Sequence, residues 1–231
     1  RESDAVLYTH AGPEIAVAST KAFLAQITAA YLLGLYLAQL NKKLFSGQIK
    51  DILADLGAIP GKIEEILAGK DQVKELARSM ADATSVLFLG RNVGYPVAME
   101  GALKLKELAY IHAEGFAAGE LKHGPIALID DGQPVFVVMP SPMDRHSLHA
   151  KVVSNIQEVR ARGARTFAVA ERGDAAVRGQ AEVVFEVPET QPMLMPLLTT
   201  VPLQIFALEL ATAKGYDVDQ PRNLAKSVTV E

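Results

Sequence analysis

The sequence predicts an α/β protein with a parallel sheet covered by helices on both faces. Four short apolar runs are typical of strands buried on both sides, and they lie at residues 85–90, 134–139, 166–170 and 183–187. Predicted helices alternate with these runs, as expected for parallel strands joined by helical crossovers. The chain has 231 residues, of which 49% are hydrophobic, which is enough for one large domain or two small ones with a buried core.

The N-terminal part is expected to form a strand and a long helix. Residues 5–9 (AVLYT) predict a short buried strand, a Gly12–Pro13 break follows, and residues 22–40 predict a helix without charged residues. This unit resembles residues 183–187 with the apolar helix expected over 195–214. If the two units are repeats, the chain holds one complete domain and the end of a preceding one. The alternative is that they share only the common strand-then-helix pattern.

Two apolar segments, residues 22–40 and 193–213, are long enough to span a bilayer. Gln26 interrupts the first, and Pro202 and Glu209 interrupt the second, which weakens the transfer of either into lipid. We therefore expect both segments to be helices buried on most sides in an α/β protein. Neither is expected to be a membrane span or a signal peptide.

The middle of the chain is expected to be helical before the main sheet begins. Residues 44–83 show amphipathic helical stretches, with breaks expected at Gly57 and at Pro60–Gly61. After the first central strand, a helix is expected over about 95–110. Another helix is expected over about 145–162, between the second and third apolar runs.

Composition excludes several functional classes. The chain has no cysteine, which excludes a disulfide scaffold, a thiolate metal site and a cysteine nucleophile. It has 27 acidic against 23 basic residues, a formal net charge of −4, which argues against a nucleic-acid surface. We expect a soluble cytoplasmic protein that uses no metal, no cofactor, no nucleic acid and no membrane.

The helix over about 95–110 carries the first candidate site. Glu100, Lys104 and Glu107 are spaced i, i+4 and i+7 and share one helical face. One interpretation is a solvated stripe of weak ion pairs. The other is a partly dehydrated cleft, in which Lys104 holds a phosphate or a developing negative charge and Glu107 moves a proton.

Two further regions could carry chemistry. Residues 113–119, rich in glycine and small residues, are expected to form a loop, and it leads to His123, the side chain best suited to proton exchange near pH 7. The last segment, 215–231, shows no clear periodicity until its end and contains Lys226. It is either a frayed terminus or a tail folded over a site, where Lys226 could attack a carbonyl as the free amine.

Three motifs resemble one known family. They are EIAVASTKAF (14–23), EGALKLKELAYIHAEGFAAGELKHGPIALID (100–130) and DVDQPRNLAKSVTVE (217–231), and together they resemble the isomerase half of the glucosamine-6-phosphate synthase family. That half consists of two sugar isomerase (SIS) domains, each a three-layer α-β-α fold. The resemblance implies four parts: the end of a first SIS domain (1–45), a helical connector (46–83), a second SIS domain (84–214) and a catalytic tail (215–231).

The resemblance also implies residue roles. Lys226 corresponds to the lysine that forms a Schiff base with the ketose, and Glu107 to the base that moves a proton between the first two sugar carbons. Lys104 corresponds to the assisting lysine. His123 corresponds to the residue that opens the sugar ring, in the site of a neighbouring subunit. The sugar-contacting positions correspond to Val17 and Ser19.

Substrate and partners follow from the same resemblance. It implies fructose 6-phosphate as substrate, glucosamine 6-phosphate as product, and a homodimer with a shared site. The family's phosphate-binding loops and its glutaminase domain would lie N-terminal to Arg1, so we expect this chain alone to have little or no synthase activity. Two alternatives remain: a stand-alone SIS deglycase or deaminase acting on sugar phosphates, and a non-catalytic SIS module that binds a sugar phosphate.

Overall fold

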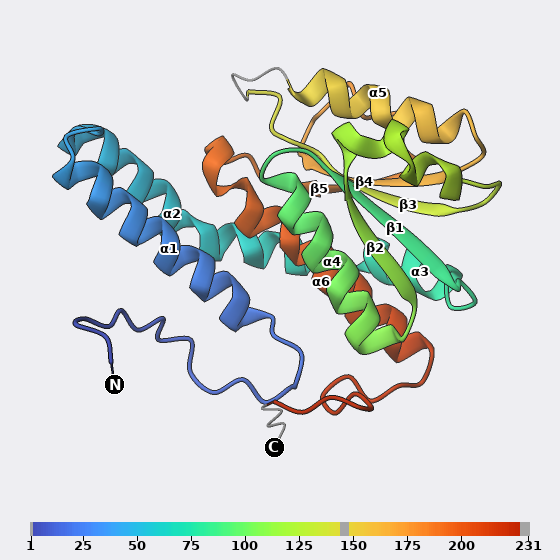
Figure 1. The fold of residues 1–231 in the computed structure, drawn as a ribbon, viewed down its shortest axis with the longest axis horizontal. Coiled ribbons are helices and arrows are strands. Elements are labelled where there is room, and N and C mark those ends of the chain that lie inside the picture. The colour runs from blue at the N-terminus through green and yellow to red at the C-terminus, as the bar shows by residue number, and fades with distance from the viewer. Residues whose placement is uncertain (1, 144–147, 227–231) are drawn as a thin grey trace.

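A computed structural model describes residues 2–143 and 148–226 of the chain. It contains a five-stranded, entirely parallel sheet of order β2-β1-β3-β4-β5 (Figure 1). The strands are β1 (Ser85–Gly90), β2 (His112–Ala117), β3 (Pro134–Val138), β4 (Arg165–Glu171) and β5 (Val183–Val187). The α/β prediction with a parallel sheet is confirmed, because the four predicted apolar runs became β1, β3, β4 and β5.

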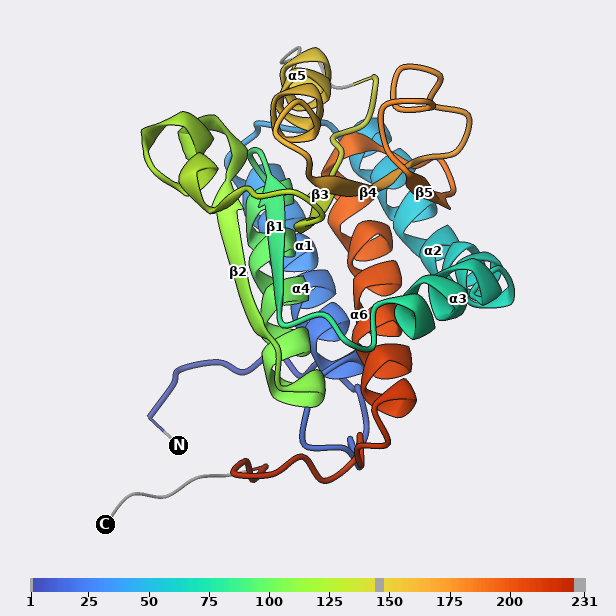
Figure 2. The same cartoon turned by 90° about the vertical axis from the view of Figure 1, so that its right-hand side faces the viewer.

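Helices cover both faces of this sheet, which gives the predicted three layers (Figure 2). The helix α5 and the 3-10 turns η1 and η2 pack on one face, and α3, α4 and α6 pack on the other, with α2 beside them. The helices are α1 (Lys21–Leu40), α2 (Ser46–Ala68), α3 (Asp71–Ser79), α4 (Gly94–Ala109), α5 (Leu148–Arg160) and α6 (Met195–Ala213). The short turns are η1 (Ala118–His123), η2 (Pro125–Leu128) and η3 (Pro192–Leu194).

An aromatic cluster joins the sheet to its helical layer. The Phe136 ring centroid lies 5.2 Å from that of Phe88, 5.1 Å from that of Phe167 and 4.5 Å from that of Phe206. Three of these rings come from adjacent strands, where alternate residues face the same side. Phe206 comes from α6, so this cluster fixes the helix on the sheet.

Two glycines allow α4 to lie close to its neighbours. A Cβ at Gly101 would lie 2.8 Å from Leu203 Cδ1 on α6, and a Cβ at Gly115 would lie 2.8 Å from the Cα of Met99. Gly101 therefore lets α4 approach α6, and Gly115 lets β2 pass against the backbone of α4. This close packing holds in place the helix that carries the predicted Lys104 and Glu107.

Three predictions of local structure are wrong: a strand at residues 5–9, a loop over 113–119 and a break in α2. Residues 5–9 form no strand, and Val6, Leu7 and Tyr8 are exposed; the described part of the sheet offers that segment no partner. The predicted loop over 113–119 is mostly the edge strand β2, which pairs with β1 despite its glycine and alanine content.

The break expected at Gly57 and Pro60 is absent, because α2 continues through both residues. Its buried side chains Ile52, Ile59 and Ile66 are spaced seven residues apart and keep one face packed on the protein, while Pro60 faces solvent. That packing offsets the hydrogen bond that proline removes from a helix interior.

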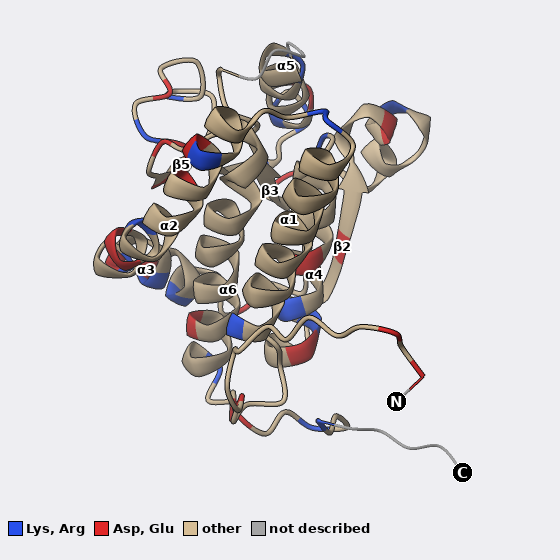
Figure 3. Ribbon diagram, turned by 90° about the vertical axis from the view of Figure 1, so that its left-hand side faces the viewer, with Lys and Arg blue, Asp and Glu red and all other residues tan. Residues whose placement is uncertain are grey.

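The two apolar segments behave differently. Both α1 and the segment Pro192–Ala213 are long and apolar enough to cross a membrane by length and composition alone. The prediction of burial is confirmed for α6, which lies inside the fold, but it is wrong for α1, where Leu35 is the one buried residue. Figure 3 shows α1 almost free of charged residues along its length, so an apolar surface is left uncovered in this chain.

Two predicted segments extend past the described residues. The helix expected over about 145–162 is described from Leu148 to Arg160, as α5. Residues 227–231 of the predicted tail also lie outside the described part of the chain.

Candidate active site

The predicted face of α4 forms a buried charge cluster. The Lys104 Nζ atom lies 2.5 Å from Glu107 Oε2 and 3.5 Å from Glu100 Oε1. The Lys104 side chain is 2% exposed, that of Glu100 8% and that of Glu107 22%. The interpretation of this face as a solvated stripe is therefore wrong, and the partly dehydrated arrangement is the one that the fold produces.

The environment of this cluster favours proton binding at Glu100. Burial raises the pKa of its carboxyl above the ordinary value; the Lys104 charge opposes this effect, and the Glu107 charge adds to it. Glu107 is the more accessible of the two carboxylates and receives the hydrogen bond from Lys104. The arrangement leaves Glu107 as the group that can exchange a proton with a molecule outside the cluster.

The C-terminal segment folds back onto the segment that precedes α1. The Lys226 Nζ atom donates to the carbonyl of Ala16 at 2.9 Å and to that of Val17 at 3.4 Å, and lies 3.7 Å from Glu14 Oε2. The backbone N–H of Val17 donates to the carbonyl of Asp219 at 3.1 Å. Of the two interpretations of this segment, the folded tail is the one that the structure shows up to Lys226.

Glu14 organises this second group, and sequence reasoning did not single it out. Its carboxylate accepts hydrogen bonds from the Ser19 hydroxyl at 3.3 Å and from the Thr20 backbone N–H and hydroxyl at 2.7 and 2.9 Å. Burial raises the pKa of Glu14, but these hydrogen bonds and the nearby Lys226 charge outweigh burial, and the pKa lies below its ordinary value. Glu14 is thus an anion that faces the ammonium of Lys226.

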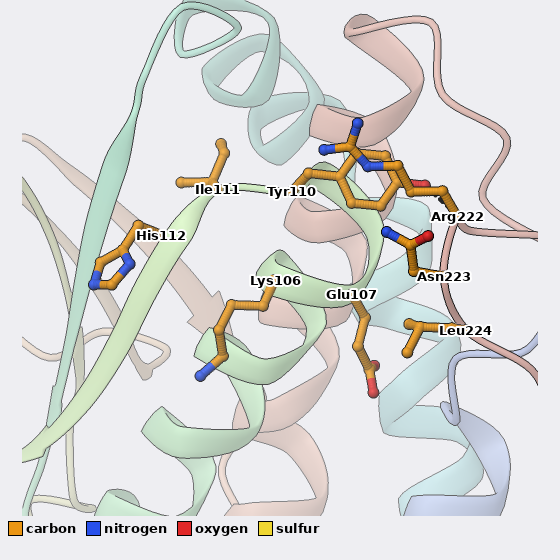
Figure 4. A pocket seen from close by; sticks show the side chains of 8 residues that line it. All are labelled: Lys106, Glu107, Tyr110, Ile111, His112, Arg222, Asn223 and Leu224. Carbon is orange, nitrogen blue, oxygen red and sulfur yellow. Dashed lines mark hydrogen bonds between the residues drawn. The ribbon is translucent and has the colours of Figure 1, made fainter. Parts of the chain in front are cut away.

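Two cavities lie beside these two groups of residues. One, of about 540 Å³, has Glu107 on one side and the C-terminal segment on the other (Figure 4). Its lining residues are Lys106, Glu107, Tyr110, Ile111, His112, Arg222, Asn223 and Leu224. The second, of about 370 Å³, is mostly apolar and is lined by Lys104 together with Ala16, Thr20 and Asp219. Lys104 therefore shares a cavity with Ala16 and Asp219, and Glu107 shares one with residues 222–224 of the C-terminal segment.

His123 is not brought to this site within one chain. Glu107 lies near the end of α4, where β2 starts at His112, whereas His123 follows the other end of β2. A strand of that length spans about 20 Å at roughly 3.3 Å per residue. His123 is exposed at the carboxyl edge of the sheet, on the side opposite Glu107.

The described residues hold no group of three or more His, Cys, Asp or Glu side chains placed to bind a metal ion.

A parallel five-stranded sheet between two helical layers is the architecture of the SIS domain class. The SIS domain family matches residues 79–214, more than half of the chain, and the chain belongs to this family.

Its relatives are more specific. The chain is 71% identical to glutamine–fructose-6-phosphate aminotransferase (isomerizing) of Corynebacterium diphtheriae over 100% of this chain and 37% of that protein. It is 38% identical to the solved C-terminal domain of glucosamine-fructose-6-phosphate aminotransferase from Francisella tularensis, with a TM-score of 0.83, over 90% of this chain and 58% of that one.

A glucosamine-6-phosphate deaminase structure from Thermotoga maritima shares the fold, with a TM-score of 0.59 and 24% identity over 93% of this chain and 58% of that chain. This likeness concerns the fold alone. The chain spans about 37% of the length of the curated aminotransferase relatives.

Proposed function

We propose that the chain is the sugar-converting part of a glutamine:fructose-6-phosphate aminotransferase (isomerizing), which makes glucosamine 6-phosphate for amino-sugar synthesis in the cytoplasm. The observation that carries this proposal is the return of Lys226 to Ala16 and Val17, beside the cavities that Lys104 and Glu107 line. An amine, a carboxylate and a buried ammonium are the groups that a reaction at a ketose carbonyl requires.

In the proposed mechanism the Lys226 ammonium gives a proton to solvent, leaves its carbonyl acceptors, and attacks C2 of the open-chain ketose as the free amine. Loss of water gives an iminium, which makes the protons on C1 more acidic. Ammonia replaces the lysine at C2, and Glu107 takes a proton from C1 and returns one to C2. Lys104, held 2.5 Å from Glu107, balances the negative charge that develops during this transfer. The anion of Glu14 stabilises the positive charge on the Lys226 nitrogen.

The remaining parts of the proposal concern groups around this site. Val17 and Ser19 are assigned to sugar contact, which their place beside Lys226 and Glu14 supports. His123 is assigned to ring opening in the site of a second subunit of a homodimer; its place at the far end of β2 from Glu107 is consistent with that role. Phosphate binding and ammonia release from glutamine are assigned to parts of a longer protein, which would also cover the apolar surface of α1.

The alternatives have less support. Relatives named for the aminotransferase match the full chain at 61–71% identity, whereas the deaminase structure is 24% identical. A non-catalytic sugar-phosphate sensor would not require Lys226 at the site.

A chimera tests the proposal. This chain replaces the matching 37% of the Corynebacterium diphtheriae relative, and glucosamine 6-phosphate formation from glutamine and fructose 6-phosphate is measured. Lys226→Ala and Glu107→Gln should each lower kcat at least about a hundredfold. Lys70→Ala is the control, because Lys70 is exposed and distant in sequence from the site. An active chimera that keeps its rate without Lys226 would refute the mechanism.

A further inference from the structure

The residue that ends α4 also contacts the C-terminal segment. Tyr110 is the C-cap of the helix that carries Lys104 and Glu107, and its φ of 55° places it in the left-handed region. That conformation is uncommon for a bulky residue and persists when surrounding contacts determine it. The contacts of the Tyr110 side chain therefore identify what holds it there.

Three contacts connect the Tyr110 side chain to the segment that follows α6. The Tyr110 hydroxyl oxygen accepts a hydrogen bond from the Arg222 backbone N–H at 2.7 Å. The Arg222 guanidinium carbon lies 4.2 Å from the Tyr110 ring centroid, and Figure 4 shows the two side chains against each other. The Tyr216 ring lies 4.8 Å from the Tyr110 ring. A hydrogen bond, a cation–π contact and an aromatic pair thus act on one side chain.

These contacts join the two elements that the proposed reaction uses. Tyr110 is three residues after Glu107, and Arg222 is four residues before Lys226. The other anchors of the segment, at Ala16 and Val17, lie before α1. Among the hydrogen bonds within residues 2–143 and 148–226, the one from Arg222 to Tyr110 is the bond that ties this segment to α4.

We infer that Tyr110 is a positioning residue. By holding the C-terminal segment through Arg222, it places Lys226 where it can act on the same substrate as Glu107. The consequence for catalysis rests on the proposed function, whereas the anchoring of the segment rests on the contacts alone. Tyr110 itself touches no reacting atom in this account; it acts through Arg222 and the backbone that leads to Lys226.

Hydrogen exchange tests the anchoring in this chain. Tyr110→Phe keeps the ring and removes the hydroxyl, so peptides spanning 216–226 should exchange about fivefold faster, the effect of losing one neutral hydrogen bond. The matched control is Tyr36→Phe, because Tyr36 is an exposed tyrosine on α1, and it should leave this exchange unchanged. Unchanged exchange in Tyr110→Phe would overturn the inference.

Kinetics in the chimera test the positioning. Tyr110→Phe should lower kcat about fivefold with KM unchanged, because the substrate contacts remain and the alignment of Lys226 is lost. Both Arg222→Lys and Arg222→Gln keep the backbone donor, but only Arg222→Lys keeps the positive charge at the Tyr110 ring. Arg222→Lys should therefore retain more of the rate than Arg222→Gln. Faster exchange without a lower kcat would overturn the positioning role. If the unchanged chimera makes no glucosamine 6-phosphate, the proposed function fails and the exchange result alone decides whether Tyr110 holds the segment.

Discussion

Replacing Lys104 by methionine should strongly destabilise the fold, because two carboxylates would lose the cation between them. The ammonium lies 2.5 Å from Glu107 and 3.5 Å from Glu100, whose side chain is 8% exposed. Removing one partner of a buried ion pair costs about 3–5 kcal/mol. Because Glu107 is 22% exposed and partly screened by water, we expect the lower end, about 3 kcal/mol at pH 7.

The assay is urea unfolding, supported by a melting curve. For a chain of this size, about 3 kcal/mol corresponds to a melting temperature lower by roughly 6–12 °C. The control is Lys106→Met, two residues further along the same helix, where the side chain is exposed and the change should stay within about 0.5 kcal/mol.

Two further results separate charge from packing. Glu100→Gln added to Lys104→Met should recover about half of the loss, because one of the two uncompensated carboxylates is gone. The deficit of the single variant should also shrink as the pH falls from 7 to 5. In that variant burial raises the pKa of Glu100 with no Lys104 charge to oppose it, so the folded state binds a proton that the unfolded state does not, and the stability of the variant falls as pH rises. A loss below about 1 kcal/mol, or one that Glu100→Gln leaves unchanged, would refute the reasoning.

Three other predictions concern separate parts of the fold. Because the pKa of Glu14 lies below its ordinary value of 4.5, its carboxylate adds stability above that pH, and the contribution is lost as the pH falls through the folded-state pKa. In urea, Glu14→Gln should therefore be less stable than the unchanged chain at pH 7, and the difference should shrink as the pH falls below 4.5; a difference that stays constant with pH would contradict the hydrogen-bond assignment. Gly57→Ala, where no atom lies within 4 Å of the new Cβ, should stabilise the chain by about 0.5–1 kcal/mol in a melting curve. Gly101→Val, whose Cβ falls 2.8 Å from Leu203 Cδ1, should destabilise it by about 1–3 kcal/mol, and a Gly101→Val chain as stable as the unchanged one would refute the packing account of α4.

The central strands could be predicted because the sequence carries their signal locally. The runs that became β1, β3 and β4 are apolar and buried on both faces, and the run that became the edge strand β5 is apolar except for Glu186. The edge strand β2 has no such signal, and its Gly115 lies where close packing against α4 leaves no room for a Cβ. The apolar residues 5–9 mislead for the opposite reason: a strand also needs a partner, and the described sheet provides none.

The candidate site, like the fold, has contacts that the sequence predicts and contacts that it does not. The contact of Lys104 with Glu107 follows from their i, i+3 spacing on one helix, but its burial depends on how α4 packs. The roles of Glu14 and Tyr110 depend on contacts with residues more than a hundred positions away, namely Lys226 and Arg222. Helical periodicity contains no information about such contacts, so they became visible only in the folded chain.

The most direct test of the account is to trap the ketose on the lysine that should bind it. The chimera is incubated with fructose 6-phosphate, reduced with borohydride and digested with trypsin, which cleaves after Arg222 and after an unmodified Lys226. A reduced adduct on Lys226 blocks the second cleavage, so the account predicts one peptide covering 223–231 that carries the mass of the reduced sugar phosphate, and its absence from Lys226→Ala. A sugar adduct confined to other lysines, or glucosamine 6-phosphate formation with no adduct at Lys226, would contradict it.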